Sequence, residues 1–369
     1  MSRRGENIYY RKDKRWEGRY PKGRKANGKI KYGSVYGKTY NEVRWKLYPL
    51  KIEYQNLCEL NGSLAITMKE WVEIWLMEVK DSIEIATFSS YRHKMRTYIL
   101  PFLGEYPLNE LTQNHIQELV QRWKKHPLSV SSIRVNLQVV KNCLNQAINQ
   151  GHLIKNPCQG IKLPKSEGKK IQAMSLNQQK QIEKAAISYP KGRGLPTLLA
   201  LRTGMRIGEV AALKWENVDF ENDLIYVSHT LQRVTLEGRS SKTLLIYATA
   251  KTAASQRTIP MGENVRRWLW EHRKSSKSAF VFSSGEGPCE PRLITYHFHQ
   301  ICQRAGISGI HFHQLRHTFA TRCVEANANI SSVSRLLGHT STQMTLDTYT
   351  HSLLQPMVET MQLMEQAVS

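Results

Sequence analysis

Hydrophobic and polar residues follow different patterns along the chain, and the first sixty residues alternate as strands do. Residues 15–20 (RWEGRY) and 29–37 (KIKYGSVYG) change side-chain character with a period of two. Asn27-Gly28 between them predicts a type I′ hairpin turn. Thr39 is then placed to N-cap a short helix, with Glu42 at the capping-box position. We therefore expect a small sheet-plus-helix module over residues 1–60.

Residues 64–160 instead show helical spacing. A capping box at Thr67 and Glu70 predicts the start of a helix. The apolar face of that helix is expected to carry Trp71, Ile74, Trp75 and Val79. Three more helices are expected over residues 87–99, 112–125 and 129–150, ending at Pro101, before Pro127 and at Gly151. Four helices without a strand pattern predict a compact helical domain.

Residues 161–170 are rich in Lys, Gly, Ser and Pro and have no apolar periodicity, which is typical of an exposed linker. The remaining segment, residues 171–369, mixes helical patterns with short strand-like runs. We therefore expect a multidomain protein that is mainly α with small β elements (α+β). Its parts would be the sheet-plus-helix module, the helical domain, and a mixed, mainly helical domain with a small antiparallel sheet.

The charge balance narrows the class of partner. The chain has 53 Lys and Arg against 30 Asp and Glu, a net charge of +23. Nucleic acid is the natural partner for such an excess. A basic membrane-surface protein is the alternative, but no stretch reaches the roughly 18 apolar residues of a spanning helix and no signal-peptide core is visible. Six scattered cysteines without a CxxC pair argue against disulfides or a zinc knuckle and fit a reducing cytoplasm.

The excess charge is concentrated in the first sixty residues, which hold 16 Lys and Arg, six Asp and Glu, and ten aromatic residues. This combination favours DNA binding over the alternative, a solvated basic face around an aromatic mini-core. The helical domain adds basic residues on its polar face. The candidate DNA-binding residues are Arg15, Arg19, Lys22, Arg24, Lys29 and Lys31 in the module, and Arg92, Lys94, Arg96, Arg134 and Lys141 in the helical domain.

Four separated segments of the last 200 residues carry candidate chemistry. In the first, LLALRTGMRIGEVAALKW (198–215), an apolar helix breaks at Thr203-Gly204 and then resumes. Arg206 is thereby placed at a tight turn against an apolar core, where a guanidinium is costly to bury unless an anion meets it. The alternative is a structural arginine paired with Glu209.

The second segment, LIYATAKTAASQRTIP (245–260), has two strand-like runs on either side of Lys251 and ends at Pro260. This pattern predicts a lysine at a hairpin tip, able to swing toward a site. An exposed lysine without a role is the alternative.

The third segment, HFHQLRHTFATRC (311–323), places His313 and Arg316 three residues apart, hence on one face of a helix. His311, His313 and His317 raise the alternative of a metal site. We disfavour it because no acidic or cysteine ligand accompanies them and an arginine lies within one turn.

The fourth segment, SRLLGHTSTQMTLDTYTH (334–351), predicts a helix end at Gly338, followed by His339 and, after a polar loop, Tyr349. Together the segments supply two arginines, a lysine, two histidines and a tyrosine. Such a set suits attack on a phosphodiester, because guanidiniums hold the non-bridging oxygens, lysine and histidine move protons, and tyrosine is a nucleophile. No carboxylate pair for two-metal chemistry is apparent.

The order and spacing of these segments resemble the tyrosine recombinase (phage-type integrase) family, of the kind found in phages and integrative/conjugative elements. The resemblance rests on TGMRIGE (203–209), KTAASQRTIP (251–260), HFHQLRHTFAT (311–321) and LGHTSTQMTLDTYTH (337–351). The family signature Arg…Lys…His-x-x-Arg…His…Tyr corresponds here to Arg206, Lys251, His313, Arg316, His339 and Tyr349. One departure is Gln314, where many relatives carry an acidic residue. Arg257 and His317 lie within the motifs and are interpreted as supporting residues.

The resemblance implies a site-specific DNA recombinase that cuts and rejoins DNA through a 3′-phosphotyrosyl intermediate and integrates and excises a mobile element. Tyr349 would be the nucleophile, Arg206 and Arg316 the phosphate clamp, and Lys251 the general acid. His313 and His339 would assist proton transfer and phosphate binding. No cofactor and no metal is expected.

The resemblance also implies a domain plan and partners. Residues 1–60 would bind arm-type DNA sites, residues 64–160 core sites, and residues 171–369 would be the catalytic domain. Expected partners are double-stranded DNA at core and arm attachment sites, a homotetramer in the synaptic complex, an excisionase and a host DNA-bending protein, with no membrane. We expect a cytoplasmic, DNA-associated bacterial protein. An apolar stripe in residues 351–369 (Leu354, Met357, Met361 and Met364) would dock either on a neighbouring protomer or on its own domain.

Two rival functions remain open at this level. A type IB topoisomerase shares the tyrosine chemistry but relaxes supercoils as a monomer without joining two sites. A non-catalytic DNA-binding regulator on the same scaffold is the other rival. The complete set of candidate catalytic residues argues against a regulator, and the arm-like N-terminus favours the recombinase over the topoisomerase.

Overall fold

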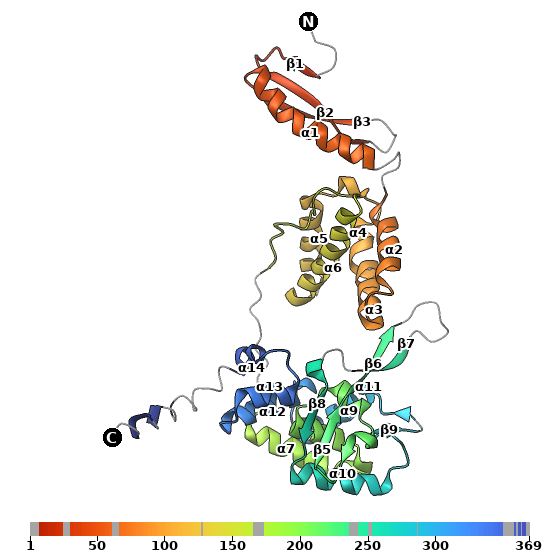
Figure 1. Ribbon diagram of the computed structural model, residues 1–369, viewed down its shortest axis with the longest axis vertical. Helices are drawn as coiled ribbons and strands as arrows, with labels where there is room; N and C mark the ends of the chain where they lie inside the picture. Colours follow the sequence, from red (N-terminus) through yellow and green to blue (C-terminus); the bar gives the residue numbers. More distant parts are fainter. Residues whose placement is uncertain are drawn as a thin grey trace. The chain divides into compact units, whose positions relative to one another are not determined.

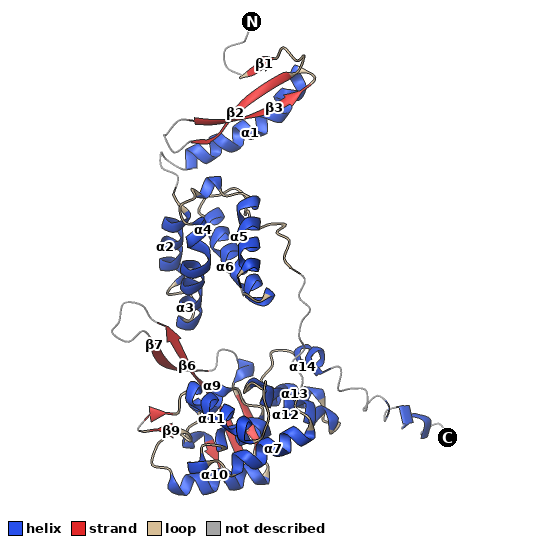
Figure 2. Ribbon diagram, turned by 180° about the vertical axis from the view of Figure 1, so that it is seen from behind, coloured by secondary structure: helices blue, strands red, loops and turns tan. Residues whose placement is uncertain are grey.

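The computed structural model describes residues 7–24, 30–60, 66–126, 128–164, 173–235, 243–249, 253–285 and 287–349, with residues 358, 361–362 and 364–366 near the C-terminus. The chain divides into two compact units, Met1–Gly168 and Lys169–Ser369, each of which is described by itself (Figure 1). The expected fold class is confirmed: the protein is mainly helical with small antiparallel sheets (Figure 2). Among the described residues, none of the helices combines the length and apolar character needed to cross a membrane.

The N-terminal module is a three-stranded antiparallel sheet, β1 (Ile8–Tyr10), β2 (Trp16–Arg24) and β3 (Ile30–Gly37), covered on one face by α1 (Tyr40–Leu60) (Figure 1). Val43 and Leu47 of α1 are buried against the sheet. A Cβ on Gly18 of β2 would lie 2.7 Å from Val43 Cγ1, so the absence of a side chain lets helix and sheet meet closely.

Two details of this module differ from the prediction or lie beyond it. The helix is 21 residues long rather than short, and it continues through Pro49. Pro49 has no backbone N–H, so the carbonyl of Trp45 lacks its usual helical hydrogen bond. Trp45 is 81% exposed on the solvent side of α1, where water can replace that bond. Asn27-Gly28 lies outside the described residues, although the β2–β3 pairing that it was expected to connect is present.

The helical domain contains α2 (Met68–Val79), α3 (Ile85–Lys94), α4 (Leu100–Leu103), α5 (Gln113–Lys125) and α6 (Val130–Asn149). The predicted capping box of Thr67 and Glu70 is present. Trp71 is fully buried, and its indole N–H donates to the carbonyl of Cys143 at 3.1 Å. Ile74, placed in the core by the prediction, is instead 40% exposed.

The predicted end of a helix at Pro101 is wrong. A π-helical segment, η1 (Met95–Ile99), continues from α3, and Pro101 lies in the first turn of α4, which ends before Gly104. A proline is tolerated in a first turn because backbone N–H groups there have no intrahelical partner. The π-helical segment therefore carries the chain past a residue that would interrupt a regular α-helix.

The second unit is built on eight helices whose bounds are α7 (Leu176–Ile187), α8 (Leu195–Thr203), α9 (Ile207–Ala212), α10 (Glu263–Ser275), α11 (Pro291–Arg304), α12 (His313–Glu325), α13 (Ile330–Leu337) and α14 (Thr342–Tyr349) within the described part of the chain. Residues 195–201 of α8 are all buried, so this helix forms the centre of the core.

Three small antiparallel sheets are seen among the described residues of the second unit. One has the order β4-β5-β8, from β4 (Val218–Asp219), β5 (Leu224–Val227) and β8 (Arg257–Pro260). The second is the hairpin of β6 (His229–Thr235) and β7 (Thr243–Thr249), and the third pairs β9 (Ser283–Ser284) with β10 (Gly287–Pro288).

The expected pairing of the two strand-like runs that flank Lys251 is wrong, and Lys251 itself lies outside the described residues. The two runs that flank it, β7 and β8, do not pair with each other, because β7 pairs with β6 and β8 with β5. β7 and β8 therefore belong to two different sheets. The sequence patterns did not predict β5 or β6. In the structure β5 pairs with β8 and β6 pairs with β7, so β7 and β8 cannot form a simple hairpin with each other.

Candidate functional site

Arg206 lies at a sharp turn between α8 and α9. Gly204 ends α8 with a left-handed φ of 67°, and α9 begins at Ile207. A Cβ on Gly204 would lie 2.6 Å from Phe319 Cδ1, so glycine is required both for the φ angle and for the close approach of α12. The predicted break is confirmed, and the Arg206 side chain remains 39% exposed.

Glu209 is the carboxylate that holds this turn. It is 4% exposed and accepts hydrogen bonds from the backbone N–H and from Nη1 of Arg206, both at 2.8 Å. Arg257 of β8 donates to both carboxylate oxygens, from Nη2 at 2.8 Å and Nη1 at 3.1 Å. Burial raises the pKa of Glu209, but the hydrogen bonds and charges of Arg257 and Arg206 outweigh it and lower the pKa overall. The structural pair of Arg206 and Glu209 is thus present, while part of the guanidinium stays accessible.

Three arginines converge on the C-terminal end of α13, which stops at Gly338 with a φ of 65°. Each of three consecutive carbonyls accepts a hydrogen bond from a different arginine: Leu336 from Arg257 Nε (2.6 Å), Leu337 from Arg316 Nη2 (2.6 Å) and Gly338 from Arg206 Nη2 (3.4 Å). The last carbonyls of a helix lack intrahelical partners and form the negative end of its dipole. This helix end therefore gathers three cations that come from the turn between α8 and α9, from β8 and from α12.

Arg316 is the most buried of these arginines, with 3% of its surface exposed. Its Nη1 also donates to the carbonyl of Gly204 at 2.9 Å, which ties the end of α8 to the end of α13. His313 begins α12 three residues before Arg316, and the prediction that the two share a helical face is consistent with this placement.

The histidines of α12 are held in the neutral form. The rings of His313 and His317 lie 4.9 Å apart in an edge-to-face arrangement. Burial, reinforced by the charges of Arg316 and Arg206, lowers the pKa of His313. Burial, with the neighbouring His313 and Arg316, lowers the pKa of His317 to about 4.

Gln314 has a structural role that needs no negative charge. Its Oε1 accepts a hydrogen bond from the backbone N–H of His311 at 2.7 Å, just before α12. An amide oxygen serves this purpose as a carboxylate would. The departure from the family pattern at this position therefore leaves the start of α12 intact.

His339 follows Gly338 directly and connects α13 to α14. Its Nδ1 lies 2.8 Å from the hydroxyl oxygen of Thr345, a fully buried residue of α14. Burial lowers the pKa of His339 to about 4, and the positive charges of Arg316 and Arg206 act in the same direction. Tyr349 is the last residue of α14. Its side chain, and the whole of Lys251, lie outside the described residues.

Of the six candidate catalytic residues, the structure therefore brings Arg206, His313, Arg316 and His339 into one neighbourhood. We call the set Arg206, Glu209, Arg257, His313, Arg316, His317 and His339 the arginine–histidine cluster. The part played by Glu209 and Arg257 was underestimated, although both lie within the quoted motifs. Thr345 was missed, and no pattern pointed to it. No group of three His, Cys, Asp or Glu side chains is placed to hold a metal ion within the described residues.

A second candidate surface lies on the N-terminal sheet, on the face opposite α1. The pairing of β2 with β3 places Glu17, Arg19, Tyr36, Ser34 and Tyr32 on this face, since Gly18 between them faces α1. The guanidiniums of Arg11 and Arg15 lie 5.7 and 5.6 Å from the centre of the Tyr36 ring.

Glu17 anchors this open face. It is 4% exposed and accepts hydrogen bonds from Arg11 Nη1 (2.6 Å), Ser34 Oγ (2.8 Å) and Arg19 Nε (3.0 Å). The bond from Arg11, followed by that from Ser34, lowers the pKa of Glu17 to about 2 despite its burial. The carboxylate thus orients two arginines whose own side chains remain largely exposed.

The other candidate DNA-binding residues occupy varied positions. Lys22 and Lys31 are exposed, and Arg15 pairs with Asp13. Lys29 and the side chain of Arg24 lie outside the described part of the chain. In the helical domain Arg92 lies over the Phe88 ring, Lys94 bonds to Ser90, and Arg96 pairs with Glu73 at 3.3 Å. Arg134 and Lys141 are exposed on α6 and line one shallow hollow with the segment 158–163.

Comparison with known proteins bears directly on this arrangement. Residues 162–355 match the model of the phage integrase family, and residues 67–124 match that of the phage integrase N-terminal SAM-like domain. The chain belongs to the phage integrase family. It is 31% identical over 360 residues to a tyrosine recombinase XerC-like protein of Caldanaerobacter subterraneus subsp. tengcongensis, covering 89% of this chain and 90% of that protein. This family member is therefore a tyrosine-type site-specific recombinase, an enzyme that cleaves and rejoins DNA.

Solved structures show the same fold. An integrase of the Tn1549 transposon in complex with circular intermediate DNA matches with a TM-score of 0.69 at 22% identity, covering 80% of this chain and 99% of that chain. A lambda integrase dimer bound to a COC′ core site matches with a TM-score of 0.61 at 19% identity, covering 95% of this chain and 96% of that chain. A lambda integrase tetramer bound to a Holliday junction matches with a TM-score of 0.60.

Proposed function

We propose that this recombinase integrates and excises a mobile element, using Tyr349 as the nucleophile and the arginine–histidine cluster as the phosphate-binding site. The observation that carries the proposal is the convergence of Arg206 and Arg316 on the end of α13, immediately before the helix that ends in Tyr349. The Tn1549 and lambda integrases, which were solved with DNA, provide independent support through the shared fold.

The proposed chemistry assigns one task to each residue. Tyr349 Oη attacks a phosphodiester, forming a 3′-phosphotyrosyl bond and releasing a 5′-oxygen. Arg206 and Arg316 hold the non-bridging oxygens and offset the charge of the transition state. Lys251 donates the proton that the leaving 5′-oxygen requires.

The histidines fit this scheme because they are neutral. The lowered pKa of His313 and the pKa of His339 near 4 mean that each imidazole can donate or accept a hydrogen bond at pH 7 without adding charge. We assign His313 to proton transfer and phosphate binding and His339 to a bond with a non-bridging oxygen. A 5′-hydroxyl of the partner strand then attacks the phosphotyrosine and restores a phosphodiester, so the reaction needs neither ATP nor a metal.

The nucleophile assignment is tested with a suicide substrate that carries the attachment site. The intact protein should form a covalent protein–DNA adduct that survives denaturing electrophoresis, and Tyr349→Phe should form none while binding the DNA normally. Tyr296→Phe is the matched control, because Tyr296 is 56% exposed on α11 in the same unit. An adduct that persists in Tyr349→Phe, or no adduct with the intact protein, contradicts the assignment.

The same preparation separates recombination from simple strand relaxation. A recombinase should resolve a synthetic Holliday junction and join two attachment sites. Relaxation of supercoiled DNA without either of these products would favour topoisomerase-like activity instead. DNA binding without any adduct would favour a regulator.

We also propose that the open face of the N-terminal sheet binds arm-type DNA sites and that the helical domain binds core sites. Arg11 and Arg19, which pair with Glu17, Arg15, which pairs with Asp13, and the exposed tyrosines of the sheet support the first part. Deleting residues 1–60 should abolish arm-site binding and spare most core-site binding. Equal loss at both sites would contradict a dedicated arm-binding module.

The proposed assembly is a homotetramer on two DNA sites, supported by the lambda integrase tetramer on a Holliday junction. An excisionase and a host DNA-bending protein are the proposed accessory partners, and the bacterial cytoplasm is the proposed location because the DNA substrate is there. Of the C-terminal stripe, Met361 and Met364 are 55% and 48% exposed, and Leu354 and Met357 lie outside the described residues.

A further inference from the structure

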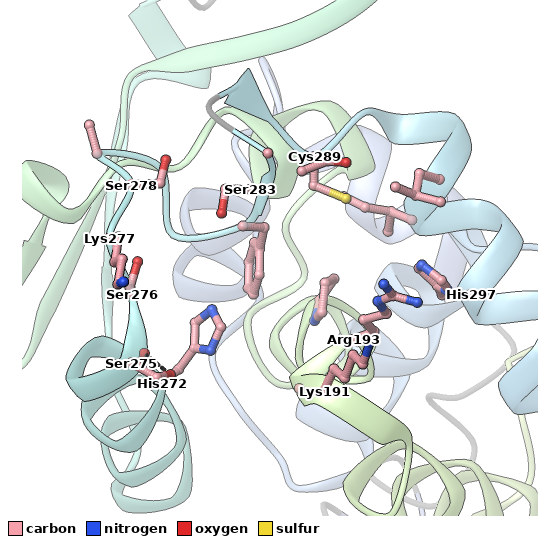
Figure 3. A pocket seen from close by; sticks show the side chains of 18 residues that line it. Lys191, Arg193, His272, Ser275, Ser276, Lys277, Ser278, Ser283, Cys289 and His297 are labelled. Atoms are coloured by element: carbon pink, nitrogen blue, oxygen red, sulfur yellow. Dashed lines mark hydrogen bonds between the residues drawn. The ribbon is translucent and has the colours of Figure 1, made fainter.

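The second unit contains a cavity of about 740 Å³ that shares no residue with the arginine–histidine cluster (Figure 3). It lies where the short helix η3 (Pro190–Gly192) leads into α8, facing the end of α10, strand β9 and the first turns of α11. Its size is in the range of cavities that hold a small organic ligand.

The walls of this cavity are basic and rich in hydroxyl groups. Lys191, Arg193 and His297 lie along one side, and the run Ser275, Ser276, Lys277 and Ser278 lies opposite, with Ser283 between them (Figure 3). No aspartate or glutamate occurs among the described lining residues. Lys191, Arg193 and Lys277 form no salt bridge with any described residue, unlike Arg206, Arg233 and Arg257 in the same unit.

Part of the cavity lining is apolar, and His297 has a defined polar neighbour. Phe282, Cys289 and Ile294 are buried lining residues. His297 is 7% exposed, and its Nδ1 lies 3.3 Å from the Tyr189 hydroxyl. Burial lowers the pKa of His297, and the charge of the neighbouring Arg193 acts in the same direction.

The loop that carries the two cations is held in an unusual backbone conformation. Lys191 has a φ of 57°, one of five positive values among the described non-glycine residues, and Gly192 follows at 66°. Non-glycine residues in this region are uncommon and concentrate at functional sites. A Cβ on Gly192 would lie 3.6 Å from His272 Nδ1, so this loop closes against the end of α10.

We propose that this cavity binds a phosphate-bearing ligand, with Lys191, Arg193 and Lys277 around the phosphate and the apolar lining residues against the rest of the molecule. A ligand with a single carboxylate would neutralise only one of these three cations. A phosphate monoester, or two neighbouring phosphodiesters, carries more negative charge and matches them better. The phosphate comes either from a free mononucleotide or from the backbone of bound DNA.

The first test is calorimetric titration of the full-length protein with adenosine 5′-monophosphate, using adenosine as the ligand without phosphate. If a free nucleotide supplies the phosphate, the wild type should bind the nucleotide and not the nucleoside. The double variant Lys191→Ala/Arg193→Ala should bind it at least about tenfold more weakly, since it loses two charged hydrogen-bond donors. Lys180→Ala/Lys184→Ala on α7 removes the same charge outside the cavity and should match the wild type.

The second test distinguishes the source of the phosphate. Anisotropy titration of a core-site duplex at one fixed salt concentration is compared among the same three proteins. If the duplex supplies the phosphate, the cavity variant loses about tenfold more affinity than the α7 variant, and the free nucleotide need not bind. If a free nucleotide supplies it, duplex affinity falls equally in both variants.

Two outcomes overturn the proposal. One is that the cavity variant and the α7 variant behave alike with both nucleotide and duplex, which would mean that only general positive charge matters. The other is that nucleotide binding is lost in Arg206→Ala and retained in the cavity variant, which would place the phosphate in the arginine–histidine cluster. Neither outcome depends on whether Tyr349 is the nucleophile.

Discussion

The buried carboxylate of Glu209 offers the sharpest test of how the site is held together. It accepts four hydrogen bonds from Arg206 and Arg257 at 2.8–3.1 Å. Glu209→Gln keeps the shape but leaves one acceptor oxygen, so about two of the four bonds are lost. At about 1.5–3 kcal/mol for each bond to a charged group, the expected loss of unfolding free energy is about 3–6 kcal/mol. This agrees with the cost of about 3–5 kcal/mol for breaking a buried ion pair.

The measurement is urea-induced unfolding of the full-length protein, followed by fluorescence and circular dichroism, with the slope and midpoint of each transition compared. Glu216→Gln is the matched control, because Glu216 is 70% exposed and its ion pair with Lys214, at 3.4 Å, lies at the surface. This control should change the free energy by no more than about 0.5 kcal/mol. If Glu209→Gln is within about 1 kcal/mol of the control, the shared carboxylate does not hold the turn.

Three further outcomes are expected. Gly204→Ala should destabilise the second unit by about 2–4 kcal/mol in the same assay, because backbone strain at a φ of 67° adds to the overlap of the new Cβ with Phe319. Gly306→Ala is the control, since Gly306 has the same φ but open space around it, and it should cost only about 1 kcal/mol. Equal losses in the two variants would contradict the overlap. The pKa of His339 is about 4 in the folded protein and 6.5 ordinarily, so the unfolded chain binds more protons between these two pH values. The free energy of unfolding should therefore fall as the pH drops from 6.5 to 4. His339→Asn should reduce that fall, and a pH profile identical to that of the wild type would refute the role of His339. Thr67→Ala removes a capping box and should cost about 1 kcal/mol in the unfolding of the helical domain, an effect that an unshifted transition would exclude.

Local signals in the sequence were sufficient for most helices of the first unit and for the helix ends near the candidate site. The caps at Thr67, Thr112 and Ser129 and the breaks at Gly204 and Gly338 depend on one or two side chains each, so they can be recognised from residue type alone. Pairing between distant strands has no such local mark. The connection around Lys251 was therefore mistaken for a hairpin, since its flanking strands belong to different sheets.

The candidate site likewise combines features that local sequence signals reveal with contacts between distant segments that they do not. The residue types of Arg206, His313, Arg316 and His339 can be read from motifs, and the structure brings all four together. Their binding partner at the end of α13 is a row of backbone carbonyls, which every residue possesses and which therefore leaves no trace in a sequence. The role of Glu209 in joining Arg206 to Arg257 likewise depends on a contact across 48 positions of the chain.

The use of backbone carbonyls has a consequence for which genetic changes the protein can tolerate. A side-chain substitution at Leu336 or Leu337 leaves the carbonyls in place, so the three arginine contacts can survive many point mutations. A single-residue insertion or deletion within α13 is different, because it rotates the helix end by about 100° and shifts it by about 1.5 Å. All three contacts would be lost together, and His339 and α14 would be displaced with them. The length of α13 should therefore be under stronger selection than the identity of its last residues.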